Sequence, residues 1–202
     1  MSCHNHLKKP HLLLHACCAP CLTASILEVI EDFDVTAYFF NPNIHPLEEY
    51  QKRKDEFANF CQKMGYHYVI ETGKETLWET ACTPLKNEKE GGERCKKCFE
   101  IRLLQTAKYA KEKDYDYFCT TLTISPHKNA DLINKIGKNV ENIISKTENT
   151  LQTFDKIEKP KFLIKNFKKK DGFKKSLQIS KEYGLFRQTY CGCRFSIRKI
   201  SV

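Results

Sequence analysis

The sequence has no long apolar run and few of the residues that form linkers. Among its 202 residues there are only 8 glycines and 7 prolines, and they do not gather into a stretch that would divide the chain. We therefore expect one α/β domain over residues 1–202, with a flexible start at residues 1–10. No run is long enough for a membrane span, and the polar N-terminal residues do not resemble a signal peptide. These absences predict a cytoplasmic protein with no membrane partner.

Negative charge is in deficit, and the positive excess is concentrated in one place. The formal net charge is +9, and the basic segment 156–175 holds nine lysines against two acidic residues, a net of +7. Phe162, Phe167 and Phe173 lie among these lysines, a composition typical of surfaces that bind a phosphate backbone. Charge alone is equally consistent with a solvated lysine-rich face, so this segment needs a second argument.

Cysteine is abundant, with 11 residues. In a reducing cytoplasm, clustered cysteines indicate metal or redox chemistry more often than disulfides. Seven thiols exceed the four ligands of one tetrahedral zinc or one iron–sulfur cluster, so we expect two metal centres, or one cluster with a reactive dithiol. These seven lie in three closely spaced groups: Cys17, Cys18 and Cys21; Cys95 and Cys98; Cys191 and Cys193.

The remaining cysteines and one histidine suit structural roles. Cys61 falls on the apolar face of a helical pattern and Cys119 within a strand pattern, so both fit core positions. Cys3 belongs to the polar start of the chain, and Cys82 is ambiguous. His15 ends an apolar run, where a histidine is more often hydrogen-bonded than a metal ligand.

Apolar periodicity alternates between strand and helix along the whole chain. This alternation predicts βαβ units and a doubly wound, mainly parallel sheet with helices on both faces. Such sheets place their chemistry at the carboxyl edge, where helix N-termini converge and favour thiolates. We therefore expect a cysteine-rich metal site at that edge, with Thr23 capping the first helix. The predicted strands are residues 12–14, 34–40, 66–70, 116–122 and 161–167, and the predicted helices are 22–30, 46–64, 74–82, 95–113, 131–144 and 173–183.

Five motifs in order resemble one family, the QueH epoxyqueuosine reductases, over about residues 12–196. They are His15-Ala-Cys-Cys-Ala-Pro20; Asn41-Pro-Asn-Ile-His-Pro46 with Glu49, Tyr50 and Arg53; Glu90-Gly-Gly-Glu-Arg-Cys-Lys-Lys-Cys98; Thr120-Thr-Leu-x-x-Ser-Pro126; and Phe186-Arg-Gln-Thr-Tyr-Cys-Gly-Cys193.

The resemblance implies a fold similar to the PP-loop, or HUP-type, nucleotide-binding sheets. It also implies reduction of the epoxide of epoxyqueuosine in tRNA to queuosine, with a [4Fe-4S] cluster beside a further iron and an unidentified electron donor. Residues Cys17 to Cys21 stand where PP-loop proteins carry a Ser/Gly-rich phosphate loop, so ATP is not implied. Some relatives have aspartate at the position of Cys21, so a second iron site here would be richer in thiolate.

Removal of the epoxide oxygen consumes two electrons and two protons, so both a reductant and an acid are needed. Our hypothesis divides the thiols between the cluster and the second metal, and takes proton donation and substrate orientation from nearby side chains. In this hypothesis the cluster is held by Cys17, Cys95, Cys98 and one of Cys191 and Cys193, and the second metal is held by Cys18, Cys21 and the other cysteine of that pair. The substrate is contacted by Tyr50, Arg53, Tyr190 and Arg187. The tRNA is contacted by Lys168, Lys169 and Lys170.

Two other classes of function remain open at this stage. The first is a zinc-stabilised RNA-binding module without catalysis, which would be colourless and redox-inert. The second is a dithiol oxidoreductase that uses Cys17 and Cys18, although adjacent cysteines close only a strained disulfide. A thioredoxin-like CxxC at a helix start is present only as Cys18 to Cys21.

Overall fold

A computed structural model describes residues 8–146 and 160–197. Cys3 and residues 156–159 of the basic segment lie outside the described residues, as do most of residues 1–10.

The structure is built on one parallel sheet of five strands in the order β3-β2-β1-β4-β5. In register, His15 of β1 lies between Tyr38 of β2 and Thr120 of β4. The chain therefore continues from β1 to β2 and β3 on one side, and later pairs β4 and β5 on the other side. This reversal of strand order makes the carboxyl end of β1 a topological switch point, where α/β sheets bind ligands. The predicted parallel, doubly wound sheet is confirmed. The strands are β1 (His11–His15), β2 (Asp34–Phe39), β3 (His67–Ile70), β4 (Tyr117–Thr120) and β5 (Lys161–Phe162).

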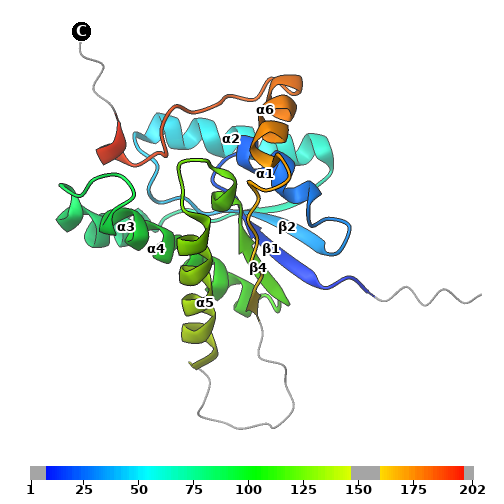
Figure 1. Ribbon diagram of the computed structural model, residues 1–202, viewed down its shortest axis with the longest axis horizontal. Coiled ribbons are helices and arrows are strands. Elements are labelled where there is room, and N and C mark those ends of the chain that lie inside the picture. Colours follow the sequence, from blue (N-terminus) through cyan, green and yellow to red (C-terminus); the bar gives the residue numbers. More distant parts are fainter. Residues whose placement is uncertain (1–7, 147–159, 198–202) are drawn as a thin grey trace, which may run out of the picture.

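Helices cover both faces of the sheet (Figure 1). α1 (Ala19–Leu27), α2 (Leu47–Met64) and α6 (Gly172–Glu182) lie on one face, and α4 (Glu93–Glu112) and α5 (Ala130–Lys146) lie on the other. The short α3 (Glu75–Cys82) packs beside α4. Three 3₁₀ turns complete the described elements: Thr83–Leu85, Thr121–Ile124 and Arg194–Ser196.

There are two buried cores because the strands place side chains on both faces of the sheet. Leu12 and Leu14 of β1 join the core under α1 and α2, whereas Leu13 joins the core under α4 and α5. A strand buried on both faces reads as an unbroken apolar run, which is why the sequence pattern there is continuous. Cys61 and Cys119 are buried in the first of these cores, as predicted.

Three sequence expectations need correction. The first helix begins at Ala19 rather than at residue 22, because Pro20 suits a first helical turn. The Thr23 hydroxyl donates to the Pro20 carbonyl oxygen at 2.9 Å, so it does not cap the helix. β5 has only two residues instead of the seven expected.

The aromatic residues of the basic segment also differ from expectation. Phe162 and Phe167 are 4% and 0% exposed, so they belong to the core and cannot stack on a nucleic acid. Phe173 alone of the three is partly exposed, and the Arg187 guanidinium lies over its ring at 5.5 Å. The interleaving of phenylalanine and lysine reflects an alternation between core and surface. Among residues 8–146 and 160–197, no helix is long and apolar enough to cross a membrane.

Candidate metal and thiol site

The loop after β1 carries the first thiol group at the carboxyl edge of the sheet. Its backbone is fixed by two hydrogen bonds: the Ala16 N–H donates to the Tyr38 carbonyl oxygen at 2.8 Å, and the Asn41 amide donates to the Ala16 carbonyl oxygen at 3.0 Å. Cys18 is the N-cap residue of α1, so Cys17 and Cys18 lie at the positive end of that helix.

Cys17, Cys18 and Cys21 form a compact triad of thiols. Their sulfur atoms lie within 4.8 Å of one another, and those of Cys17 and Cys18 are 3.8 Å apart. Hydrogen bonds from Cys18 and Cys21 hold the pKa of Cys17 well below its usual range. Burial and a hydrogen bond with Cys17 raise the pKa of Cys18 to about 12. Hydrogen bonds with Cys17 and Cys18, together with burial, raise the pKa of Cys21. Cys17 is therefore the thiol of the triad that most favours the thiolate form.

A second thiol group lies around the start of α4. Cys95 and Cys98 occupy its first two turns, as predicted, and Cys98 packs in a buried cluster with Cys82, Cys193 and Trp78. The Gly91 N–H donates to the Cys95 sulfur at 3.2 Å. Cys191 packs against the same cluster. The structure thus gathers both predicted pairs, Cys95/Cys98 and Cys191/Cys193, and adds Cys82, which the sequence left ambiguous.

The C-terminal segment 184–193 brings Cys191 and Cys193 to the second group. Near its start, the Gln188 amide donates to the Cys18 sulfur at 2.7 Å, which ties this segment to the first thiol group. Towards its end, the His45 N–H donates to the Gly192 carbonyl oxygen at 2.8 Å. The segment therefore touches both thiol groups on its way across the edge of the sheet.

Cys191 is the second site of negative charge. The hydrogen bond that Cys193 donates to Cys191 lowers the pKa of Cys191 to about 5. The same hydrogen bond raises the pKa of Cys193. The Lys128 ammonium lowers the pKa of both Cys191 and Cys17. The positive charge of one lysine in the segment before α5 thus makes a small contribution at both groups.

Two buried arginines supply further positive charge around the thiols. Arg94 and Arg102 are each 2% exposed. Arg94 donates to three backbone carbonyl oxygens, while the Arg102 Nη2 donates to the Asn41 side-chain oxygen. Among the described residues, no carboxylate forms an ion pair with Arg102. Its charge acts instead on Cys17, Cys98 and His15.

His15 has the structural role expected of it. Its side chain is fully buried, with Nδ1 2.9 Å from the Thr120 hydroxyl and Nε2 3.1 Å from the Phe40 carbonyl oxygen. Burial and the charge of Arg102 lower its pKa to about 3, so the ring is neutral at physiological pH.

The residues present fit a thiolate-ligated metal centre. Sulfur ligands are those that iron–sulfur clusters and zinc prefer. A buried guanidinium without a carboxylate needs compensating negative charge nearby, and several thiolates provide it. Two buried polar atoms beside the thiols, Arg102 Nε and Trp78 Nε1, have no hydrogen-bond acceptor among the described residues. Both are donors, so both suit a site that gains negative charge when it is filled.

Of the predicted substrate-contacting residues, Arg53 contacts the C-terminal segment and Tyr190 belongs to it. Arg53 is 1% exposed and donates to Glu49 at 2.7 Å and to the Tyr190 carbonyl oxygen at 3.1 Å. The Tyr190 hydroxyl donates to the His45 carbonyl oxygen. Burial raises the pKa of both Tyr50 and Tyr190, so both phenols stay protonated at neutral pH.

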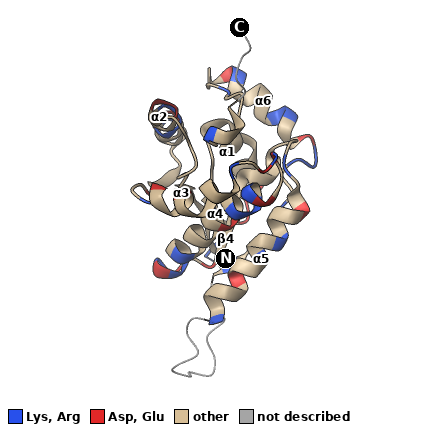
Figure 2. Cartoon of the chain, turned by 90° about the vertical axis from the view of Figure 1, so that its left-hand side faces the viewer, with Lys and Arg blue, Asp and Glu red and all other residues tan. Residues whose placement is uncertain are grey.

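Arg187 and the predicted lysines lie toward α6. Arg187 donates to the Ser180 hydroxyl at 3.2 Å and so contacts α6. Lys168 Nζ donates to the Lys128 carbonyl oxygen at 2.5 Å, while Lys169 and Lys170 are exposed. Lysine and arginine residues recur along α5 and α6 (Figure 2). Lys168 thus reaches the loop after β4, whereas the Lys170 ammonium acts on Glu28, the C-cap residue of α1 at the end remote from Cys18.

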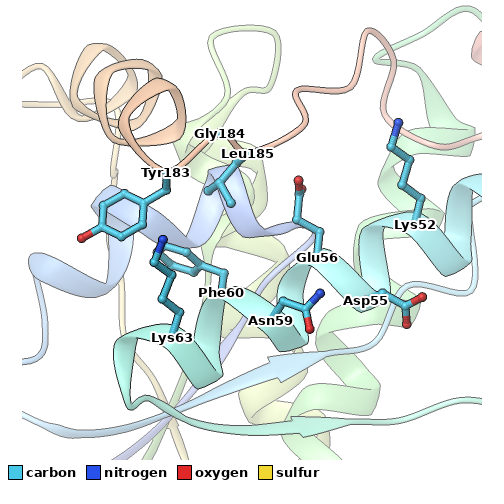
Figure 3. A pocket seen from close by; sticks show the side chains of 9 residues that line it. All are labelled: Lys52, Asp55, Glu56, Asn59, Phe60, Lys63, Tyr183, Gly184 and Leu185. Carbon is cyan, nitrogen blue, oxygen red and sulfur yellow. The ribbon is translucent and has the colours of Figure 1, made fainter.

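A surface hollow of about 480 Å³ lies apart from the cysteines, between the outer face of α2 and the end of α6 (Figure 3). Lys52, Glu56 and Lys63 of α2 line it, opposite Tyr183 and Leu185. No cysteine contributes to its walls. This polar, open hollow is therefore distinct from the thiol site.

Comparison with known proteins decides the family. A family model described as epoxyqueuosine reductase QueH matches residues 12–199. The chain belongs to this family. The resemblance read from the sequence motifs is thus confirmed.

Curated QueH relatives match along nearly the whole chain. The epoxyqueuosine reductase QueH of Staphylococcus epidermidis is 40% identical over 200 residues, covering 95% of this chain and 78% of the relative. That of Streptococcus pyogenes serotype M1 is 36% identical, covering 94% of this chain and 71% of the relative. That of Thermotoga maritima is 36% identical, covering 92% and 90% respectively. These relatives are named as reductases, in line with the predicted oxidoreductase class.

A solved structure supports the fold. The U34-tRNA thiolase NcsA from Methanococcus maripaludis, solved with its [4Fe-4S] cluster, has a TM-score of 0.55 at 16% identity. The match covers 95% of this chain and 63% of the thiolase, so the chain spans less than two thirds of that protein. The expected α/β fold is confirmed, and the two chains share it.

Sequence reasoning missed several residues of the site in this QueH-family chain. Trp78 belongs to none of the five motifs, and Gln188 lies within the fifth motif but was given no role. Arg102 had a usable signal, since it lies four residues after Cys98 and therefore on the same face of α4. Lys128 had none, because only the loop after β4 brings it to the thiols.

Proposed function

We propose that this protein reduces the epoxide of epoxyqueuosine in tRNA to the alkene of queuosine. The observation that carries the proposal is the gathering of seven motif cysteines into two groups at the carboxyl edge of the sheet, in a chain of the QueH family. The C–O bonds of the epoxide break, the oxygen leaves as water, and two electrons from an external reductant and two protons balance the reaction.

The thiol geometry supports an amended division of the ligands. Cys17, Cys18 and Cys21 lie close enough for one metal ion, and we assign an additional mononuclear iron to them. The [4Fe-4S] cluster would be held by the second group: Cys95, Cys98, Cys191 and Cys193. When bound, such a cluster supplies electrons at low potential, and an iron with an open position supplies a Lewis acid.

The remaining residues of the site would bind substrate and move protons. We assign proton donation to the neutral phenols of Tyr50 and Tyr190, and positioning of the C-terminal segment to Arg53. Arg187 would orient the nucleoside. The charge of Lys128 acts on both thiol groups, so this lysine is a further candidate for contact with an anionic or oxygen-bearing substrate group.

The basic segment supports tRNA as the carrier of the substrate. An anticodon loop presents phosphates and unstacked bases, and lysines bind phosphates with a strong dependence on salt. Lys168 reaches the loop after β4, Lys169 and Lys170 are exposed next to it in the chain, and a reaction on tRNA is consistent with the cytoplasm. Since Phe162 and Phe167 are buried, we assign this contact to charge and not to aromatic stacking.

Iron and sulfide analysis of the anaerobically purified protein tests the cofactor. We expect a brown protein whose visible absorption bleaches with dithionite and whose iron exceeds its sulfide. In Cys98→Ala, iron content and reduction of epoxyqueuosine-containing tRNA should both fall, whereas Cys61→Ala, a buried cysteine outside both groups, should keep them. A colourless protein with bound zinc after cluster reconstitution would refute the reductase and favour a zinc-stabilised RNA-binding module.

Charge reversal tests the tRNA contact. The double variant Lys169→Glu/Lys170→Glu should weaken tRNA binding and flatten its dependence on salt concentration, by about one unit of log–log slope for each phosphate that the variant no longer neutralises. Lys8→Glu/Lys9→Glu makes the same change of charge at the opposite, amino edge of the sheet and serves as the matched control. Equal salt slopes for the two double variants would contradict the assignment.

A further inference from the structure

Trp78 is the single tryptophan of the chain and lies inside the second thiol group. Its side chain is fully buried on α3. The ring stacks on Phe195 with centroids 6.0 Å apart, and it contacts His45 at 5.4 Å and the Arg194 guanidinium at 5.9 Å. Neighbours from two separate segments, the loop after β2 and the turn Arg194–Ser196, therefore fix the orientation of the indole.

The indole N–H has no acceptor in good hydrogen-bond geometry among the described residues, although Trp78 Nε1 is buried. A buried donor without a partner costs about 1–3 kcal/mol, and native proteins retain very few. A phenylalanine could fill this space without burying an unpaired donor, so packing alone does not explain the tryptophan. The unpaired donor therefore indicates an acceptor that becomes stronger when a ligand fills the site.

The nearest candidates for that acceptor are sulfur atoms. Trp78 shares one buried cluster with Cys82, Cys98 and Cys193. The indole N–H is close enough to act on Cys98, where it lowers the pKa, although burial, the larger effect, raises it. A neutral thiol is a weak acceptor, whereas a metal-bound thiolate or sulfide is a strong one. The donor is thus oriented for the loaded site.

We propose that Trp78 Nε1–H donates a hydrogen bond to the Cys98 sulfur of the metal-loaded site, and that this hydrogen bond raises the reduction potential of the cluster. This inference rests on the proposed cluster at the second thiol group. A hydrogen bond to a cluster sulfur stabilises the reduced, more negative state, because the donor dipole compensates part of the added charge. Trp78 is a positioning and tuning residue, and it does not touch the substrate.

Trp78→Phe tests the inference because it keeps an aromatic ring and removes the N–H. We expect iron and sulfide content equal to wild type, with a midpoint potential shifted to a more negative value in spectroelectrochemical titration. Phe195→Leu is the matched control: it disturbs the same stack and leaves the indole N–H, so its potential should stay near that of wild type. An unchanged potential in Trp78→Phe, at equal iron and sulfide, would overturn the proposal.

A second measurement needs no variant and decides the case if Trp78→Phe fails to fold. Wild-type protein labelled with ¹⁵N-tryptophan carries one labelled indole, so pulsed EPR of the dithionite-reduced protein reports on Trp78 alone. We expect one ¹⁵N coupling to the paramagnetic centre, and the absence of any coupling would refute the hydrogen bond. Wild-type protein that holds no iron and sulfide would instead overturn the proposed function, and this inference with it.

Discussion

Replacement of Gly192 by alanine should release the C-terminal segment from the site. Gly192 lies between Cys191 and Cys193 with φ +98°, a conformation that residues with a side chain rarely adopt. A Cβ added there would lie 2.8 Å from Ile44 Cγ1 and 3.2 Å from the Arg53 guanidinium. The segment therefore approaches the loop after β2 so closely that only glycine fits.

The expected cost comes from two sources. Holding alanine in a left-handed conformation costs about 1–2 kcal/mol, and overpacking against Ile44 adds about 1–3 kcal/mol. Because about 1.4 kcal/mol changes an equilibrium constant tenfold, a total of about 2–5 kcal/mol shifts the docking equilibrium of the segment by about 30- to 4,000-fold. Cys193, which is 6% exposed, would then open to solvent far more often.

Thiol labelling of the metal-free protein measures this opening directly. Iodoacetamide should modify Cys193 faster in Gly192→Ala than in wild type. The rate of modification is measured by mass spectrometry of the C-terminal peptide. When closing is faster than alkylation, the labelling rate follows the opening equilibrium. The variant should also lose iron on reconstitution, because two ligands of the second group leave together.

Gly73→Ala is the control for backbone strain alone. Gly73 has φ +82°, but nothing lies within 4 Å of an added Cβ, and it sits in the loop before α3. We expect a modest loss of stability there with unchanged Cys193 labelling. Equal Cys193 labelling rates in wild type and Gly192→Ala would refute the reasoning.

Three further predictions concern packing, charge and pH. In Gly137→Ala the new Cβ would lie 2.3 Å from the Phe162 ring, so the free energy of unfolding should fall by about 1–3 kcal/mol in urea titration, without loss of iron from the reconstituted protein. Arg102→Met removes a buried positive charge that faces the thiols, so iron content after reconstitution should fall while the fold persists by circular dichroism. Burial tends to raise the pKa of Glu71, but hydrogen bonds from neighbouring lysine, tyrosine and glutamine side chains outweigh it and the pKa is lowered. Ionised Glu71 should therefore stabilise the fold above its unfolded pKa of about 4.3, and this contribution is lost as pH falls through the lower folded value. The difference in stability between wild type and Glu71→Gln should shrink below about pH 4, and a constant difference would contradict the assigned cause.

The fold was predictable because its signals are local. Apolar periodicity located the strands and helices, and Gly65, at φ +69°, ends α2 as expected. The alternation of strand and helix then left a parallel sheet with chemistry at its carboxyl edge as the natural arrangement. Short elements were less predictable: β5 has two residues because its pairing with β4, a tertiary contact, defines it.

The candidate site was predictable in its cysteines and unpredictable in their surroundings. Spacing identified the seven thiols, since CxxC and CxC patterns are local. The division of those thiols into a triad on one side and a second group on the other depends on where residues 184–193 cross the sheet edge. The partners of Trp78 and Arg102 follow from that crossing as well.

The sequence by itself determined the alternating elements, the family motifs and the number of thiols. Tertiary structure decided which thiols are neighbours, that Phe162 and Phe167 serve the core, and that the charge of Lys128 acts on both thiol groups. The physical reason is range. Hydrophobic periodicity and motif spacing act over a few residues, whereas a thiolate is stabilised by whatever charge or donor the folded chain brings within a few ångströms.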